Sequence, residues 1–209
     1  TVTPLSNNGE IVTAPYPCTS LPVDDPALAR AVDTAAARAN KGVAVDLPVA
    51  VGFCMLIRRA CLDSVGLFDV ATWGRGYGEE VDFCLKARAL GWRHVAAADA
   101  FVVHRGSVSF GDEKRERILE SARKIAERYP FYDGLVQRFI AADPLAPARR
   151  AIDLALIREA LEGERVLHVS HDFGGGTERH LRAAAAAERA AGAAPLVLRF
   201  AASGEAGLE

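Results

Sequence analysis

A near-continuous apolar run limits most strongly how this chain can fold. It covers Leu47–Ile57 (LPVAVGFCMLI) and includes several β-branched residues. Such a run is typical of a strand buried on both faces, which needs helices on either side of the sheet. Gly52 interrupts the run and indicates a bulge or a point of close approach. The sequence therefore predicts an α/β fold with a buried strand at this place.

Helical patterns surround the apolar run. Four helices are predicted, over Ala27–Ala39, Arg58–Val65, Glu79–Leu90 and Lys114–Tyr129. The first follows Asp25 and Pro26, a good N-cap and first-turn pair. The third has acidic residues in its first turn, which suits the helix dipole, and Gly91 closes it. A short strand is predicted over Ala100–His104.

A second pattern begins after the proline-containing segment Asp143–Pro147. A linking helix is predicted over Arg149–Glu162. Residues 165–200 then read as strand, glycine-rich turn, Ala-rich helix and strand, which is one β-α-β unit and the opening of a Rossmann-like domain. We therefore predict a first domain over residues 1–147, a linker over 148–164 and the start of a second domain over 165–209.

Composition excludes several classes of protein. Half of the 209 residues are hydrophobic, a quarter are charged, and the formal net charge is −2. This balance is globular and offers no basic field for nucleic acid. No apolar run reaches the ~20 residues of a membrane span. The four cysteines form no C-x-x-C pair, which favours reduced thiols in a cytoplasmic protein.

Acidic side chains follow a glycine-rich loop at the start of the third helix. The loop is Trp73–Gly78 (WGRGYG), and Glu79, Glu80 and Asp82 come directly after it. An isolated acidic first turn usually serves only the helix dipole. The glycine-rich loop before it and the V-V-H-x-G-S sequence after it reverse that preference. They favour carboxylates presented to a cleft, where one can take a proton from an attacking hydroxyl.

Between Val51 and Phe110 the chain contains VGFCMLIRR, VGLFD, GYGEEVDFCLKARALGW and VVHRGSVSF. Here it resembles the family 2 glycosyltransferases of the GT-A fold, over most of residues 1–145. The resemblance implies an incomplete GT-A (nucleotide-diphospho-sugar transferase-like) mixed sheet with flanking helices. It also implies an inverting, metal-dependent transfer of a sugar from a nucleoside-diphosphate sugar to a bacterial glycan or lipid-linked acceptor.

The resemblance also assigns roles to residues. Glu80 matches the catalytic base, with Asp82 as second choice and Glu79 beside it, in the pattern E-E-x-D where many members have E-D-x-D. His104 matches a ligand of the divalent metal, Mn²⁺ or Mg²⁺, that bridges the diphosphate in many relatives. Imidazole suits Mn²⁺ better than Mg²⁺. A hydrogen-bonded structural histidine is the alternative for His104.

Further candidates line the expected site. Those expected to contact substrate are Gly52, Trp73, Arg75, Gly76, Tyr77 and Gly78, and those expected to contact phosphate are Arg105, Ser107 and Ser109. Trp73 and Tyr77 could equally pack the loop down. In the second domain Gly174, Gly175 and Gly176 form a turn that resembles the acceptor-side loop of GT-B (family 4) glycosyltransferases. Trp92 and His94 are expected to be structural, and Asp69 is expected to cap the backbone.

The alternatives remain open at this point. Residues 1–51 contain no D-x-D, the chain begins at Thr1, and its only methionine is Met55. We therefore expect an excerpt with little activity of its own, whose donor-binding half lies upstream. A sugar-binding or interdomain module without catalysis is the second hypothesis, and a metal-dependent hydrolase is the third. We expect a location in the cytoplasm or at the inner membrane face, and self-association through an exposed sheet edge.

Overall fold

The computed structural model describes the chain except for residues 75–76, 106–111, 161–163, 172, 201–205 and 209. The fold is mixed α/β, with 50% helix and 18% strand. Two compact units divide the chain, Thr1–Leu156 and Ile157–Glu209. The division falls inside helix α7 (Ala146–Ala160), which begins where the sequence predicted the end of the first domain.

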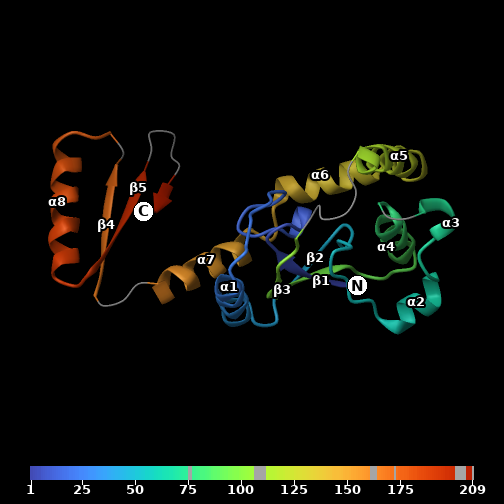
Figure 1. Cartoon of the computed structure of the whole chain (residues 1–209), viewed down its shortest axis with the longest axis horizontal. Coiled ribbons are helices and arrows are strands. Elements are labelled where there is room, and N and C mark those ends of the chain that lie inside the picture. The colour runs from blue at the N-terminus through green and yellow to red at the C-terminus, as the bar shows by residue number, and fades with distance from the viewer. Residues whose placement is uncertain (75–76, 106–111, 161–163, 172, 201–205, 209) are drawn as a thin grey trace. The chain divides into compact units, whose positions relative to one another are not determined.

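A small mixed sheet forms the centre of the first unit (Figure 1). Its strands are β1 (Val2–Ser6), β2 (Ala44–Asp46) and β3 (Val95–Val102), in the order β1-β3-β2. The pair β1–β3 is parallel and the pair β2–β3 is antiparallel. On the outer edge of β1, Val2 exchanges two backbone hydrogen bonds with Leu56, and Ala14 donates to Ser6. These bonds occupy part of the edge that another chain would need for pairing.

Helices of the first unit surround or extend from this sheet, together with the 3₁₀ turn η1 (Glu10–Val12). Besides α7 they are α1 (Pro26–Ala39), α2 (Arg59–Val65), α3 (Val70–Trp73), α4 (Glu79–Ala89), α5 (Asp112–Arg128) and α6 (Tyr132–Ala142). The Asp25 side chain accepts from the Ala27 backbone N–H, so the expected cap of α1 is confirmed. Asp69 caps α3 in the same way, through the Thr72 N–H.

Two hydrophobic clusters hold the first unit together. One lies where α1, α7 and the N-terminal segment meet the sheet, and includes Leu5, Val12 and Leu145, all fully buried. The other surrounds α4 and includes Trp73 and Phe83. The acidic turn of α4 packs against this second cluster.

The predicted strand over Leu47–Ile57 is wrong. Strand β2 ends at Asp46, and the apolar run that follows is irregular yet buried through most of its first half. Its backbone N–H groups find scattered acceptors in place of a strand ladder: Leu47 donates to the His94 carbonyl, Ala50 to the Cys84 sulfur and Val51 to the Thr3 hydroxyl. Burial alone therefore produces an apolar pattern that is otherwise typical of a strand.

Other elements differ in position. The strand predicted over Ala100–His104 is β3, which begins at Val95 and ends before His104. The small residues Ala96–Ala98 lack the bulky side chains that mark a strand, but they fit under α1, so two of them are fully buried. The sequence patterns do not predict α3 or α6. The predicted helices near residues 27–39, 58–65, 79–90 and 114–129 are present within about two residues.

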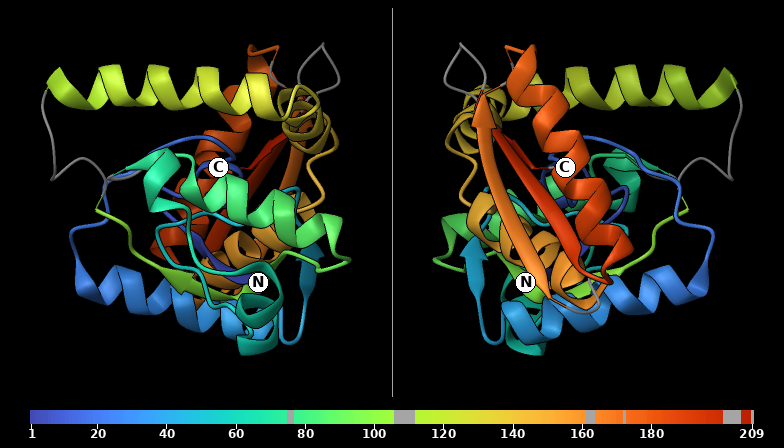
Figure 2. Two further views of the ribbon diagram at one scale, coloured as in Figure 1. Left: turned by 90° about the vertical axis from the view of Figure 1, so that its right-hand side faces the viewer. Right: turned by 90° about the vertical axis from the view of Figure 1, so that its left-hand side faces the viewer.

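The second unit confirms the predicted β-α-β pattern. Strands β4 (Arg165–His171) and β5 (Ala194–Phe200) are parallel and α8 (Gly176–Ala190) connects them, while β6 (Ala206–Leu208) is antiparallel to β5. Figure 2 shows α8 alongside β4 and β5. His168 and Arg199 pair with Glu188 and Glu178 of α8. The opposite face of the sheet carries Leu167, Val169 and Phe200, which are exposed.

None of the helices that the structure describes combines the length and the apolar character that crossing a bilayer requires.

A buried arginine ties the N-terminal segment to α7. The Arg149 guanidinium donates to the backbone carbonyls of Ile11 and Thr13 and pairs with Asp143. Its side chain is 3% exposed. Because a buried charge is stable only when its donors are satisfied, this geometry fixes residues 11–13 relative to α7.

We expect Arg149→Met to lower the unfolding free energy of the first unit by about 3 kcal/mol, since it leaves two carbonyls without a donor and Asp143 unpaired. Arg150→Met is the matched control, because Arg150 is exposed on the same helix. Both tryptophans lie in the first unit, so fluorescence during urea unfolding reports on that unit. Equal stability of the two variants would contradict the role given to Arg149.

Candidate functional site

The acidic turn is held in place by a close contact between a glycine and an indole. Gly78, the N-cap of α4, has φ +102°, and a Cβ there would lie 2.7 Å from the Trp73 ring. Trp73 is 5% exposed and belongs to the cluster around α4. The indole therefore packs the loop down, and only glycine fits above it.

Glu80 is the best-placed carboxylate of the acidic turn. It is half-buried, and its Oε2 accepts a hydrogen bond of 3.3 Å from the Gly78 backbone N–H. Burial raises the pKa of Glu80, and the neighbouring carboxylates of Glu79 and Glu10 raise it further. A carboxylate whose pKa is raised toward neutrality is suited to accept a proton.

The Asp82 carboxylate has a structural role. It is 1% exposed, accepts a hydrogen bond of 2.6 Å from the Tyr129 hydroxyl, and pairs with Lys86 and Arg128. These bonds tie α4 to the end of α5. Asp82 thus holds the helix that carries Glu80, and its oxygens already have partners. The structure therefore favours Glu80 over Asp82 as the reactive carboxylate.

Two buried polar atoms beside this turn lack a partner among the described residues. They are Nε1 of Trp73 and Oε2 of Glu79. Buried polar atoms are nearly always hydrogen-bonded, so these two are exceptions among the described residues. Both belong to residues that the sequence singled out, and both lie at the N-terminal end of α4.

His104 is held by the N-terminal segment. Its Nδ1 lies 2.6 Å from the Asn8 carbonyl oxygen, and its backbone N–H donates to Oδ1 of Asn7. A carbonyl only accepts, so in the neutral ring Nδ1 carries the proton, and Nε2 makes no hydrogen bond with the residues that the structure describes. This is the orientation that a metal-binding or proton-accepting imidazole needs.

The segment Gly52–Phe53 connects Glu80 with His104. A Cβ on Gly52 would lie 3.4 Å from Cγ of Glu80, and the Phe53 ring stacks on the His104 imidazole at 5.2 Å between centroids. The two side chains thus flank consecutive residues of one segment. Gly52 is exposed, so the segment is open to solvent between them.

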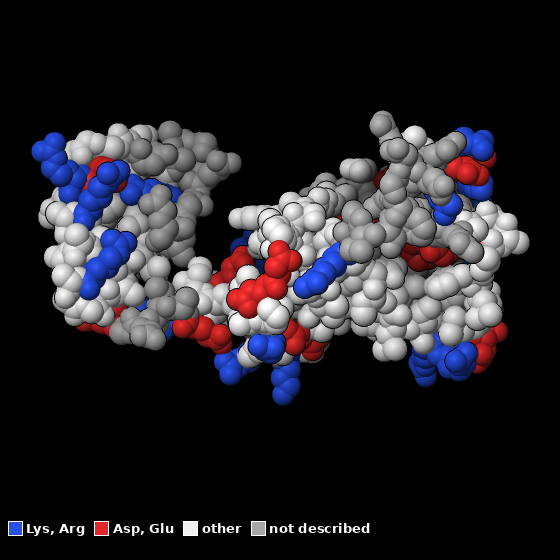
Figure 3. Space-filling model, viewed as in Figure 1, with Lys and Arg blue, Asp and Glu red and all other residues white. Residues whose placement is uncertain are grey.

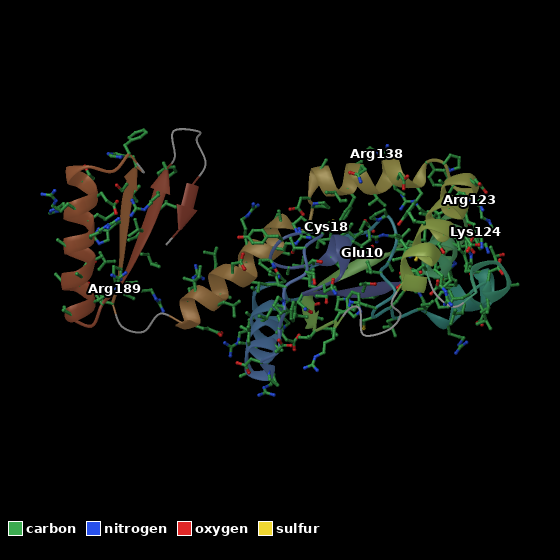
Figure 4. All side chains as sticks on the ribbon, turned by 45° about the horizontal axis from the view of Figure 1, so that its top comes forward. Glu10, Cys18, Arg123, Lys124, Arg138 and Arg189 are labelled. Carbon is green, nitrogen blue, oxygen red and sulfur yellow. The ribbon has the colours of Figure 1, made fainter. Side chains whose placement is uncertain are left out.

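Glu10 is a site residue that the sequence patterns did not reveal. It has φ +51°, unusual for a residue with a side chain, and its carbonyl accepts from the Thr13 N–H, the Thr13 hydroxyl and the Cys18 N–H. Figure 4 shows Glu10 and Cys18 close together. Strained backbone held by several bonds is common at functional sites. No local motif marks Glu10, because its position depends on contacts made far away in the sequence.

The Glu10 carboxylate is near enough to both main candidates to interact with them electrostatically. Its side chain is accessible to water, yet surrounding protein raises its pKa by burial, and the nearby His104 opposes that rise. Tyr132 lies within electrostatic range of both carboxylates: burial, followed by the charges of Glu10 and Glu80, raises the pKa of its hydroxyl. Glu10, Glu80, His104 and Tyr132 therefore form one group, which we call the Glu80–His104 cluster.

A hollow of about 330 Å³ opens beside His104. It is lined by Asn7, Asn8, Ser20, Leu21, Pro22, Val23, Asp24, Val103, His104 and Arg105. Arg105 is exposed there, so its guanidinium is accessible to a ligand. On the face drawn in Figure 3, basic and acidic side chains of the first unit are interspersed.

Several of the predicted site residues are not part of the Glu80–His104 cluster. Arg75, Gly76, Ser107 and Ser109 lie outside the described residues. Tyr77 is half-buried with φ +69°. In the second unit Gly174 and Gly175 have positive φ, and a Cβ added to either would meet no described atom within 4 Å, so the turn needs glycine for its backbone conformation.

The residues present fit a metal ion only in part. Across the described ranges, no three His, Cys, Asp or Glu side chains converge as a metal cage would require. His104 offers a single nitrogen ligand, Nε2. A divalent cation at this place would need most of its ligands from a bound diphosphate or from groups other than these residues.

No protein-family model, no curated protein and no solved structure matches this chain.

We expect Gly78→Ala to unfold the first unit more easily than Gly91→Ala. Both glycines have positive φ at the two ends of α4, but only Gly78 contacts Trp73. Gly91→Ala should cost about 1 kcal/mol from backbone strain, and Gly78→Ala roughly 2 kcal/mol more from the clash. Urea unfolding followed by tryptophan fluorescence measures both, and equal losses would contradict the contact.

We expect Glu10→Gln to lower the pKa of Glu80, because removing a facing negative charge makes ionisation of Glu80 easier. Carboxyl ¹³C NMR across a pH series measures this value, with the Glu80 signal assigned from Glu80→Gln. Glu120→Gln is the control, since Glu120 pairs with Lys124 on α5. A Glu80 pKa that is the same in the unmutated chain and in both variants would remove Glu10 from the cluster.

Proposed function

We propose that the first unit is the acceptor-side half of a family 2 (GT-A) glycosyltransferase domain and that it takes part in inverting sugar transfer. The donor would be a nucleoside-diphosphate sugar, and the acceptor a bacterial glycan or its lipid-linked precursor. The observation that carries the proposal is the placement of Glu80 and His104 on either side of Gly52–Phe53, open to solvent.

The chemistry of the proposal requires a proton acceptor near the acceptor hydroxyl. As that oxygen attacks C1 of the sugar, the bond from C1 to the diphosphate oxygen breaks, and Glu80 takes the hydroxyl proton. The raised pKa of Glu80 makes it a better base than an exposed carboxylate. Asp82 supports this step by holding α4 through Tyr129, Lys86 and Arg128.

His104 serves the leaving group in this proposal. Its protonated Nδ1 is occupied by the Asn8 carbonyl, so Nε2 faces away from that bond and is available. A divalent cation, when bound, supplies positive charge to the departing diphosphate. His104 would hold that cation through Nε2, and the described residues offer no further ligand set.

The second unit supports a parallel proposal. The sequence β4, glycine turn, α8 and β5 has the parallel β-α-β arrangement of a Rossmann-like start, as in the GT-B glycosyltransferases that the sequence resembles. We propose that it opens a second sugar-transferring domain.

We expect Glu80→Gln to lower kcat for sugar transfer by about 100-fold or more with little change in donor binding, because the amide cannot accept the proton. The measurement is release of nucleoside diphosphate by the intact protein in which this sequence occurs. Transfer by the unmutated protein should rise with pH through the raised pKa of Glu80, since only the ionised form is a base.

Glu120→Gln is the matched control for turnover. Glu120 lies on α5 and pairs with Lys124, so its loss should leave kcat unchanged. Asp82→Asn should instead lower stability, since it removes the charge that pairs with Lys86 and Arg128. Full turnover by Glu80→Gln would reject the catalytic role and favour a sugar-binding module.

A further inference from the structure

A second hollow in the first unit adjoins the hollow beside His104 and shares Asn7, Leu21, Pro22 and Val23 with it. It has a volume of about 320 Å³ and lies between α1, α7 and the N-terminal segment. Its walls are mainly apolar: Leu28 and Val32 come from α1, Ile152 and Leu156 from α7, and Phe101 from β3. This volume is at the lower end of the range for small-molecule pockets, about 300 to 1,000 Å³.

The polar groups in its wall divide into two kinds. Arg149 is fully engaged with two backbone carbonyls and Asp143. Asn7 is engaged as well, through the Leu21 carbonyl and the His104 N–H. Both therefore act as structural supports for the hollow.

Asp153 is the exception among these polar groups. It lines the hollow one helical turn after Arg149 and is half-buried, and it makes no hydrogen bond or ion pair with any described residue. Burial raises the pKa of Asp153. A half-buried carboxylate in an apolar wall is stabilised by a ligand that brings a hydrogen-bond donor or a positive charge.

We propose that this hollow binds a small amphipathic amine, with the apolar part between α1 and α7 and the ammonium group on Asp153. Shape and charge both point to this class of ligand. The apolar walls exclude a sugar or a phosphate, whose hydroxyls and oxygens would find few partners. An alkyl chain fills the hollow, and the single acidic group orients it.

The test compares three probes of one chain length: octylamine, 1-octanol and octanoate. Each is titrated into the ¹⁵N-labelled chain, and amide shifts of Val32, Ile152 and Leu156 give the Kd. We expect octylamine to bind about ten-fold or more tightly than octanol, because a charged hydrogen bond replaces a neutral one. Octanoate should bind most weakly, since its charge repels Asp153.

Two variants make the result decisive. Asp153→Asn keeps the shape and should reduce the preference for octylamine over octanol to about one-fold, that is, to none. Val32→Trp fills the hollow and should abolish binding of all three probes. Equal affinity for octylamine and octanol in the unmutated chain, an undiminished preference in Asp153→Asn, or shifts confined to other residues would each overturn the proposal.

Discussion

The buried Arg149 is the interaction on which most of the first unit depends. By binding the carbonyls of Ile11 and Thr13, its guanidinium fixes the η1 turn against α7. That turn sets the strained backbone of Glu10, and the residues just before it, Asn7 and Asn8, hold His104. One charged side chain therefore anchors the segment that carries Glu10 and follows the two residues that bind His104, although it touches neither of these side chains. The same arginine forms part of the wall of the apolar hollow, so both candidate sites share one support.

Two carboxylates of the acidic turn, those of Glu80 and Asp82, have different surroundings. Glu80 has backbone donors at Gly78 and at its own N–H, two neighbouring carboxylates and a half-buried side chain. Asp82, two residues later, is buried among a phenol, an ammonium and a guanidinium. Burial and the neighbouring carboxylates raise the pKa of Glu80, whereas the oxygens of Asp82 are held by three side chains. Surroundings that differ in this way can suit one carboxylate for a structural role and another for the proposed proton transfer within a single turn of helix.

The sequence predicted what depends on local patterns. Caps, glycine stops and helical spacing located α1, α2, α4 and α5, and the change of pattern after residue 165 located the β-α-β unit. The sequence did not predict features whose conformation depends on contacts between segments far apart in the chain. The Leu47–Ile57 run is apolar because it is buried, and its conformation is set by acceptors on Thr3, Cys84 and His94. Glu10 carries no local signal, since its role comes from residues near positions 80, 104 and 132.

The irregular course of that run has a consequence for how the protein can change over time. Hydrogen bonds in a strand ladder join backbone to backbone, so most substitutions leave them intact. The bonds to the Val51 and Ala50 N–H groups instead depend on the Thr3 hydroxyl and the Cys84 sulfur. Exchanging either side chain would reshape the loop that separates Glu80 from His104 while leaving β1, β2 and β3 paired. The contour facing a ligand can therefore evolve separately from the sheet.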